Sequence, residues 1–65
     1  MPLVTLSIPE KVYTREQKEA LIAGITDAIA AVGGERQRPL TKIMVQEYPE
    51  GNWGSGGKVH IPKGS

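Results

Sequence analysis

The sequence predicts an α+β fold: a single β-α-β unit with a parallel two-stranded sheet, a short C-terminal strand or hairpin, and assembly into an oligomer. Three features of the 65 residues predict it. Apolar residues alternate near the start, follow helical spacing in the middle and alternate again afterwards. A strand, a helix and a strand within about 45 residues form a β-α-β unit, whose strands lie parallel with a right-handed crossover.

The first predicted strand covers residues 3–8. Its β-branched and aliphatic residues follow a period of two, which gives the strand one strongly apolar face. Because proline lacks the N–H that a strand partner needs, we expect the strand to end at Pro9. The alternation runs Val4, Thr5, Leu6, Ser7 and Ile8.

The predicted helix covers residues 15–32. Thr14 and Gln17 have the capping-box spacing, in which each side chain accepts a hydrogen bond from the backbone N–H of the other residue. Gly33 and Gly34 supply the left-handed residue that commonly ends a helix. We expect one apolar stripe of this helix to face the sheet. The stripe comprises Leu21, Ile25, Ala28, Ile29 and Val32.

The opposite face of the helix is charged, and we expect it to be exposed. It carries Arg15, Lys18, Glu19 and Asp27. Gly24 lies inside the helix, where glycine costs about 1 kcal/mol relative to alanine. We therefore expect a sheet or a second helix to approach the chain closely at Gly24.

The remainder of the chain contains a loop and two further extended segments. Residues 35–39 form a polar loop, and residues 41–47 form the second strand with Ile43 and Val45 on one face. Residues 58–61 are expected to form a third strand at an edge. Two strands under one helix leave the other sheet face bare, and such a unit is not stable on its strand count alone.

Size and composition predict one domain, residues 1–65, that associates with other copies. A chain of this length buries only about 60% of its unfolded surface, and the sequence has no cysteine for disulfides. A net charge of +1 and a pI near 8.1 give no sign of a nucleic-acid partner. No apolar run reaches the roughly 20 residues of a membrane span, and no secretory signal precedes the fold, so we expect a cytoplasmic protein.

Several catalytic and cofactor sites are excluded by the residues present. The single histidine, His60, cannot form a zinc site alone, so no metal is expected. The glycines at 54–57 lack the spacing of a phosphate-binding loop, because Lys58 is followed by Val59 and Asn52 replaces the first glycine. These glycines therefore give no sign of a nucleotide-binding loop.

Pro2 is the residue that suggests chemistry. Removal of Met1 would leave Pro2 with a free secondary amine at the start of a buried strand. Free α-amines have a pKa of about 7.7–8.0, and apolar walls or nearby cations lower the pKa further. An unprotonated amine held rigidly in place meets the requirements of a general base.

Three segments resemble the 4-oxalocrotonate tautomerase family. They are the opening 2–6, the helix residues 16–18 continuing to 21–22, and the ending 52–57 with Trp53 between Asn52 and Gly54. The resemblance implies β-α-β subunits assembled as hexamers. It also implies that the terminal proline moves a proton in isomerisations of 2-hydroxy-dienoates or enols of keto acids, without cofactor or metal.

The resemblance also implies cations that bind a small-molecule carboxylate and stabilise the developing oxyanion, with an aromatic residue lining the pocket. By position the aromatic residue is Trp53, and the two arginines of the family fall on Lys42 and near Lys11. Lysine keeps the charge but loses the planar fork that holds a carboxylate. Arg36 or Arg38 could supply that fork from the loop.

Two alternatives stay open at this point. In the hydratase or dehalogenase branch of the superfamily the prolyl amine stays protonated and a carboxylate activates water, for which Glu47 and Glu10 are candidates. The chain could also be a non-catalytic subunit of a homo- or hetero-oligomer, which retention of Met1 would favour.

Overall fold

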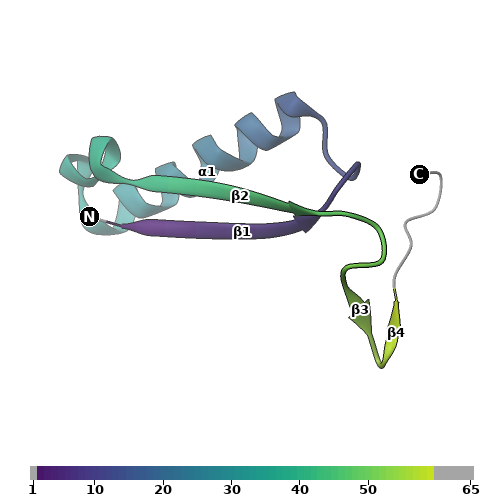
Figure 1. Cartoon of the computed structure of the whole chain (residues 1–65). Helices are drawn as coiled ribbons and strands as arrows, with labels where there is room; N and C mark the ends of the chain where they lie inside the picture. Colours follow the sequence, from purple (N-terminus) through teal and green to yellow (C-terminus); the bar gives the residue numbers. More distant parts are fainter. Residues whose placement is uncertain (1, 60–65) are drawn as a thin grey trace.

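The computed structural model describes residues 2–59, which form a strand-helix-strand body with a small hairpin attached (Figure 1). A single helix lies across one face of the main sheet, and the hairpin extends away from it. In chain order the elements are β1 (Leu3–Pro9), α1 (Arg15–Gly33), the 3₁₀ helix η1 (Glu35–Leu40), β2 (Lys42–Tyr48), β3 (Gly54–Ser55) and β4 (Lys58–Val59). The predicted β-α-β unit is confirmed.

Strands β1 and β2 are parallel, and they pair from Leu3 opposite Lys42 to Pro9 opposite Tyr48. The expectation that the strand ends at Pro9 is confirmed, and Pro9 is its last paired residue. Pro9 needs no N–H of its own there, because the N–H of Glu10 donates to the carbonyl of Tyr48 at 2.8 Å.

Helix α1 begins and ends as its sequence predicts, within one residue. Thr14 Oγ1 accepts from the N–H of Gln17 at 3.1 Å, and Gln17 Oε1 accepts from the N–H of Thr14 at 2.8 Å. At the other end Gly34 has a φ of 101°, which favours glycine, and its N–H donates to Ala30. The capping box and the glycine end are both confirmed.

The face that α1 turns to the sheet overlaps the predicted stripe only in part: Leu21, Ile25 and Ile29 are half-buried, as predicted. Ala30 is 3% exposed and is the most buried residue of the helix, whereas Val32 is 92% exposed. Lys18 was expected on the outer face, yet it is half-buried and its Nζ lies 3.1 Å from Glu47 Oε1 on β2. The face of α1 that packs on the sheet is therefore rotated about the helix axis relative to the predicted face. Lys18 can lie on this face because its aliphatic stem covers apolar surface while its ammonium group pairs with Glu47 at the edge of the sheet.

Two further expectations are corrected downstream of α1. Residues 35–39 are not a loop but the first part of η1, in which the N–H of Gln37 donates to the carbonyl of Gly34 at 3.0 Å. The predicted short C-terminal strand or hairpin is confirmed, but it is not an edge strand of the main sheet. The described part of segment 58–61, β4, pairs with β3 in a separate antiparallel hairpin; residues 60 and 61 lie outside the described residues.

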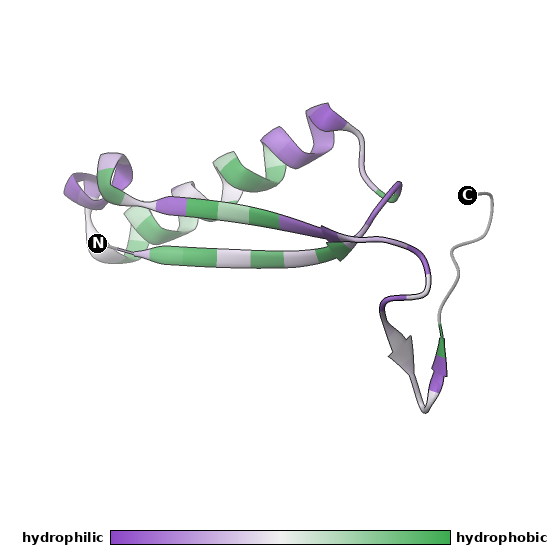
Figure 2. Ribbon diagram, viewed as in Figure 1, coloured by the Kyte–Doolittle hydropathy of each residue, from purple (hydrophilic) through white to green (hydrophobic). Residues whose placement is uncertain are grey.

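Very little of the described chain is buried. Within residues 2–59 only Ile8, at 8% exposed, and Ala30 form a buried core. Apolar and polar residues alternate along β1 and β2 (Figure 2), and the less exposed positions of the alternation are the apolar ones. The sheet face away from α1 is bare, as expected, and is mostly polar. Leu3 is 64% exposed and Met44 46% exposed on this bare sheet face.

Gly24 has no close neighbour within the described residues. A Cβ built at this position would meet no heavy atom within 4 Å. The expected approach of the sheet at Gly24 is therefore wrong for the single chain, and an approach by a helix of another copy stays a prediction.

Candidate active site

Pro2 lies immediately before β1 and beside the C-terminal part of α1. Its carbonyl accepts a hydrogen bond of 3.0 Å from the N–H of Lys42, which ties the start of β1 to the start of β2. Pro2 is half-buried. Because side chains alternate along a strand, Pro2 lies on the same, helix-facing side as Val4, two residues later. The proline ring is thus held at a defined place between the sheet and the helix.

An open cavity of about 480 Å³ lies at Pro2, between β1, α1 and η1. It falls within the roughly 300–1,000 Å³ typical of small-molecule sites. Its wall is almost entirely apolar, and Gln37 is its one polar side chain. The other lining residues are Val4, Ile25, Ala28, Ile29, Val32 and Gly33. We call it the Pro2 cavity.

The backbone of Lys42 is hydrogen-bonded to Pro2, but the side chain of Lys42 lies on the other face of the sheet. It pairs with Leu3, and both residues belong to the exposed alternation of their strands. Side chains opposite each other in a sheet share a face, so Lys42 points to the side away from α1. It does not line the Pro2 cavity of its own chain.

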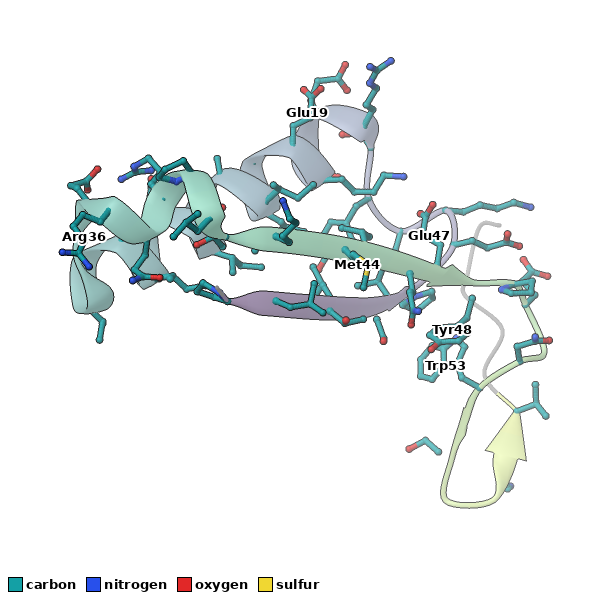
Figure 3. All side chains as sticks on the ribbon, turned by 60° about the vertical axis from the view of Figure 1, so that its left-hand side comes forward. Glu19, Arg36, Met44, Glu47, Tyr48 and Trp53 are labelled. Carbon is teal, nitrogen blue, oxygen red and sulfur yellow. The ribbon has the colours of Figure 1, made fainter. Side chains whose placement is uncertain are left out.

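Trp53 lies at the far end of β1. It lines a second cavity, of about 260 Å³, together with Ser7, Ile8, Pro9 and Tyr48, and Figure 3 shows it next to Tyr48. The seven residues of β1 rise about 3.3 Å each, which puts Trp53 about 20 Å from Pro2.

Lys11 lies at the same end of the chain as Trp53. It follows the end of β1 and is exposed. Its backbone has a φ of 67°, in the left-handed region that side chains other than glycine seldom adopt.

Arg38 lies at the Pro2 end, but its guanidinium is engaged with carboxylates. It donates to Asp27 Oδ1 at 2.6 Å and, through two nitrogens, to Glu35 at 2.9 and 3.1 Å. The hydrogen bonds from Glu35 and Asp27 raise the pKa of Arg38, and the Arg38 hydrogen bond lowers the pKa of Glu35. These pairs tie η1 to α1. The neighbouring Arg36 is exposed at the end of the molecule farthest from Trp53 (Figure 3).

The two carboxylates considered as water-activating groups are both placed away from Pro2. Glu47 pairs with Ile8 in the register and forms the ion pair with Lys18. Glu10 follows Pro9 at the same end of β1. Neither residue lines the Pro2 cavity.

One chain by itself therefore divides the predicted site between its two ends. Pro2, Arg38 and the backbone of Lys42 lie at one end, and Lys11 and Trp53 at the other. Sequence reasoning did not single out Gln37, which lines the Pro2 cavity. A helical reading of residues 35–40 would have found it, because it places Gln37 four residues after Gly33 on the side of α1.

The described part of the chain contains neither a candidate metal centre nor a candidate membrane span. Within residues 2–59, no group of three or more metal-ligating side chains could hold an ion. No helix in that part is both long and apolar enough to cross a membrane.

Comparison with known proteins agrees with this architecture. Residues 2–60 match the family model described as "Tautomerase enzyme". The chain is 36% identical over 58 residues to probable tautomerase K2 of Dickeya dadantii (strain 3937), covering 89% of this chain and 85% of that protein. It is also 36% identical over 64 residues to probable tautomerase RSp0893 of Ralstonia nicotianae (strain ATCC BAA-1114 / GMI1000), covering 97% and 83%.

A solved structure has the same fold. The crystal structure of YwhB, a homologue of 4-oxalocrotonate tautomerase, superimposes with a TM-score of 0.80 at 26% identity, covering 89% of this chain and 92% of that one. The resemblance noted in the three sequence segments is confirmed by these matches. With its β-α-β topology and a family match over nearly its whole length, the chain belongs to the tautomerase family.

Proposed function

We propose that this protein catalyses a cofactor-independent keto-enol tautomerisation, with Pro2 as the general base after removal of Met1. The observation that carries the proposal is the place of Pro2, half-buried at the head of β1 in the wall of an apolar cavity. Family membership supports the same chemistry.

The reaction needs one base that takes a proton and gives it back. The lone pair of the Pro2 nitrogen takes the proton of the substrate's enol hydroxyl, and the electron pair of that O–H bond becomes the new C=O bond. Pro2 then returns the proton to the substrate carbon, and the electron pair of the former C=C bond forms the new C–H bond. Apolar surroundings such as Val4, Ile25 and Ile29 disfavour the charged form of the amine, which keeps the lone pair available.

The negative charge on the substrate requires cations, which we assign to Lys42 and Lys11, with Trp53 packing on the carbon chain. The third predicted cation, Arg38, is already paired with Asp27 and Glu35. Because one chain separates Pro2 from Lys11 and Trp53 by about 20 Å, the complete site needs residues from neighbouring copies. We therefore propose a homo-oligomer, a hexamer as in the family, whose site lies between subunits. The exposed apolar residues support this assembly. The cytosolic location stays a prediction of the sequence.

Intact-mass measurement and one substitution test the proposal. We expect the purified protein to lack one methionine and to tautomerise an enol such as phenylenolpyruvate. Pro2→Ala should lower kcat by at least about 100-fold, the lower bound for a general base, with circular dichroism and sedimentation unchanged. Retained Met1 makes the Pro2 nitrogen an amide without an available lone pair, so that result, or equal turnover by the variant, would refute the proposal.

A further inference from the structure

Gln37 is the one polar side chain that lines the Pro2 cavity. It is held from several sides. Its N–H donates to Gly34, its carbonyl accepts from Thr41 Oγ1 at 2.7 Å, and its side chain packs on Gly33, where an added Cβ would lie 3.1 Å from Gln37 Cγ. The amide is therefore presented from a fixed backbone.

The side-chain amide of Gln37 differs from those of the other two glutamines in having no partner. Gln17 accepts from Thr14 in the capping box, and Gln46 accepts from the hydroxyl of Tyr48 at 3.3 Å. Within residues 2–59 the Gln37 amide makes no hydrogen bond of its own. Gln37 is half-buried, and its amide is free to donate a hydrogen bond to a ligand oxygen in the cavity.

The charge of the cavity is equally informative. None of its lining residues carries a charge, and Arg38, next to Gln37, is engaged by Asp27 and Glu35. Burying a carboxylate without a paired cation is costly, whereas an aryl or alkyl group gains from contact with Ile25 and Val32. The cavity therefore fits an apolar body with one polar oxygen better than a second carboxylate.

We propose that Gln37 donates a hydrogen bond to the enol or keto oxygen of the substrate, and that the Pro2 cavity selects a monocarboxylate with an apolar body over a dicarboxylate. This inference rests on the proposed function, because it takes the Pro2 cavity as the reaction site. Pro2 and Gln37 then act on one ligand from β1 and η1.

Binding is tested on the ¹⁵N-labelled full-length protein by NMR. Titration with phenylpyruvate, an apolar monocarboxylate that carries a 2-keto oxygen, should shift the side-chain NH₂ signals of Gln37 and leave those of Gln17 unchanged. A 2-keto dicarboxylate such as 2-oxoadipate should bind at least about 10-fold more weakly. Equal or tighter binding of the dicarboxylate, or an unmoved Gln37 signal at phenylpyruvate saturation, would overturn the inference.

Kinetics with phenylenolpyruvate test the role of the amide. Gln37→Met keeps the length of the side chain but removes its N–H, and should raise KM or lower kcat/KM by about five- to tenfold, the value of roughly 1 kcal/mol. Gln46→Met is the matched control and should leave both constants unchanged. Unchanged constants in Gln37→Met contradict the inference alone, whereas full activity in Pro2→Ala contradicts the proposed function.

Discussion

Lys11 is the one residue other than glycine among residues 2–59 with a positive φ, 67°. A left-handed backbone costs a residue with a Cβ about 1–2 kcal/mol, and glycine avoids that cost. The turn after β1 therefore carries a lysine where a glycine would be more stable. A side chain kept at a strained position agrees with a role in binding, which is the role we propose for the Lys11 ammonium.

Lys11→Gly separates stability from binding. We expect the free energy of unfolding to rise by about 0.5–1 kcal/mol because the strain is relieved, net of the greater flexibility of glycine in the unfolded chain. The KM for a carboxylate substrate should rise about 10-fold with the loss of a charged hydrogen bond. Urea unfolding and steady-state kinetics measure the two effects.

Lys11→Ala is the matched control, since it removes the charge and keeps the strained φ. It should raise KM as much as Lys11→Gly without any gain in stability. A normal KM in both variants would remove Lys11 from the site.

At the scale of elements, α1 shows which local signals are reliable. The capping box of Thr14 and Gln17 and the glycine end at Gly34 formed as expected, because both depend on residues within one turn. The inward face of the helix depends on what packs against it. Lys18 turned inward because Glu47 on β2 lies within 3.1 Å, a partner 29 residues away.

Gly24→Ala tests the exposed flank of α1. Since nothing lies within 4 Å of the added methyl group, the substitution should stabilise the protein by about 1 kcal/mol through helix propensity. Thermal and urea unfolding measure the change. Ala23→Gly at the neighbouring exposed position should destabilise the protein by a similar amount. A loss of stability in Gly24→Ala would mean that another helix packs at this position in the assembled protein.

At the scale of the whole molecule, the described chain lacks a core large enough to stand alone. Two buried residues, Ile8 and Ala30, cannot offset the cost of ordering residues 2–59, at about 1.5 kcal/mol per residue. The bare sheet face with Leu3 and Met44 provides apolar surface that another copy can cover. This shortage supports the proposed assembly, as family membership does.

Met44→Glu should therefore prevent assembly. A charge placed on the bare sheet face would have to be buried without a partner, which costs several kcal/mol per interface. Sedimentation velocity should show a shift from the oligomer to monomer or unfolded chain, with loss of activity. Met44→Leu conserves volume and should retain the oligomer. An unchanged oligomer in Met44→Glu would place the interface elsewhere.

Sequence alone determined the β-α-β order, the ends of α1, the exposure of one sheet face and the family, because these depend on neighbours along the chain and on pattern. It also pointed to Pro2. Only the tertiary structure decided that η1 is helical, that Arg38 is engaged by Asp27 and Glu35, and that Gln37 lines the cavity at Pro2. The physical reason is that the Arg38–Asp27 pair and the cavity at Pro2 depend on how α1, η1 and the sheet pack together, which residue spacing within one segment does not determine.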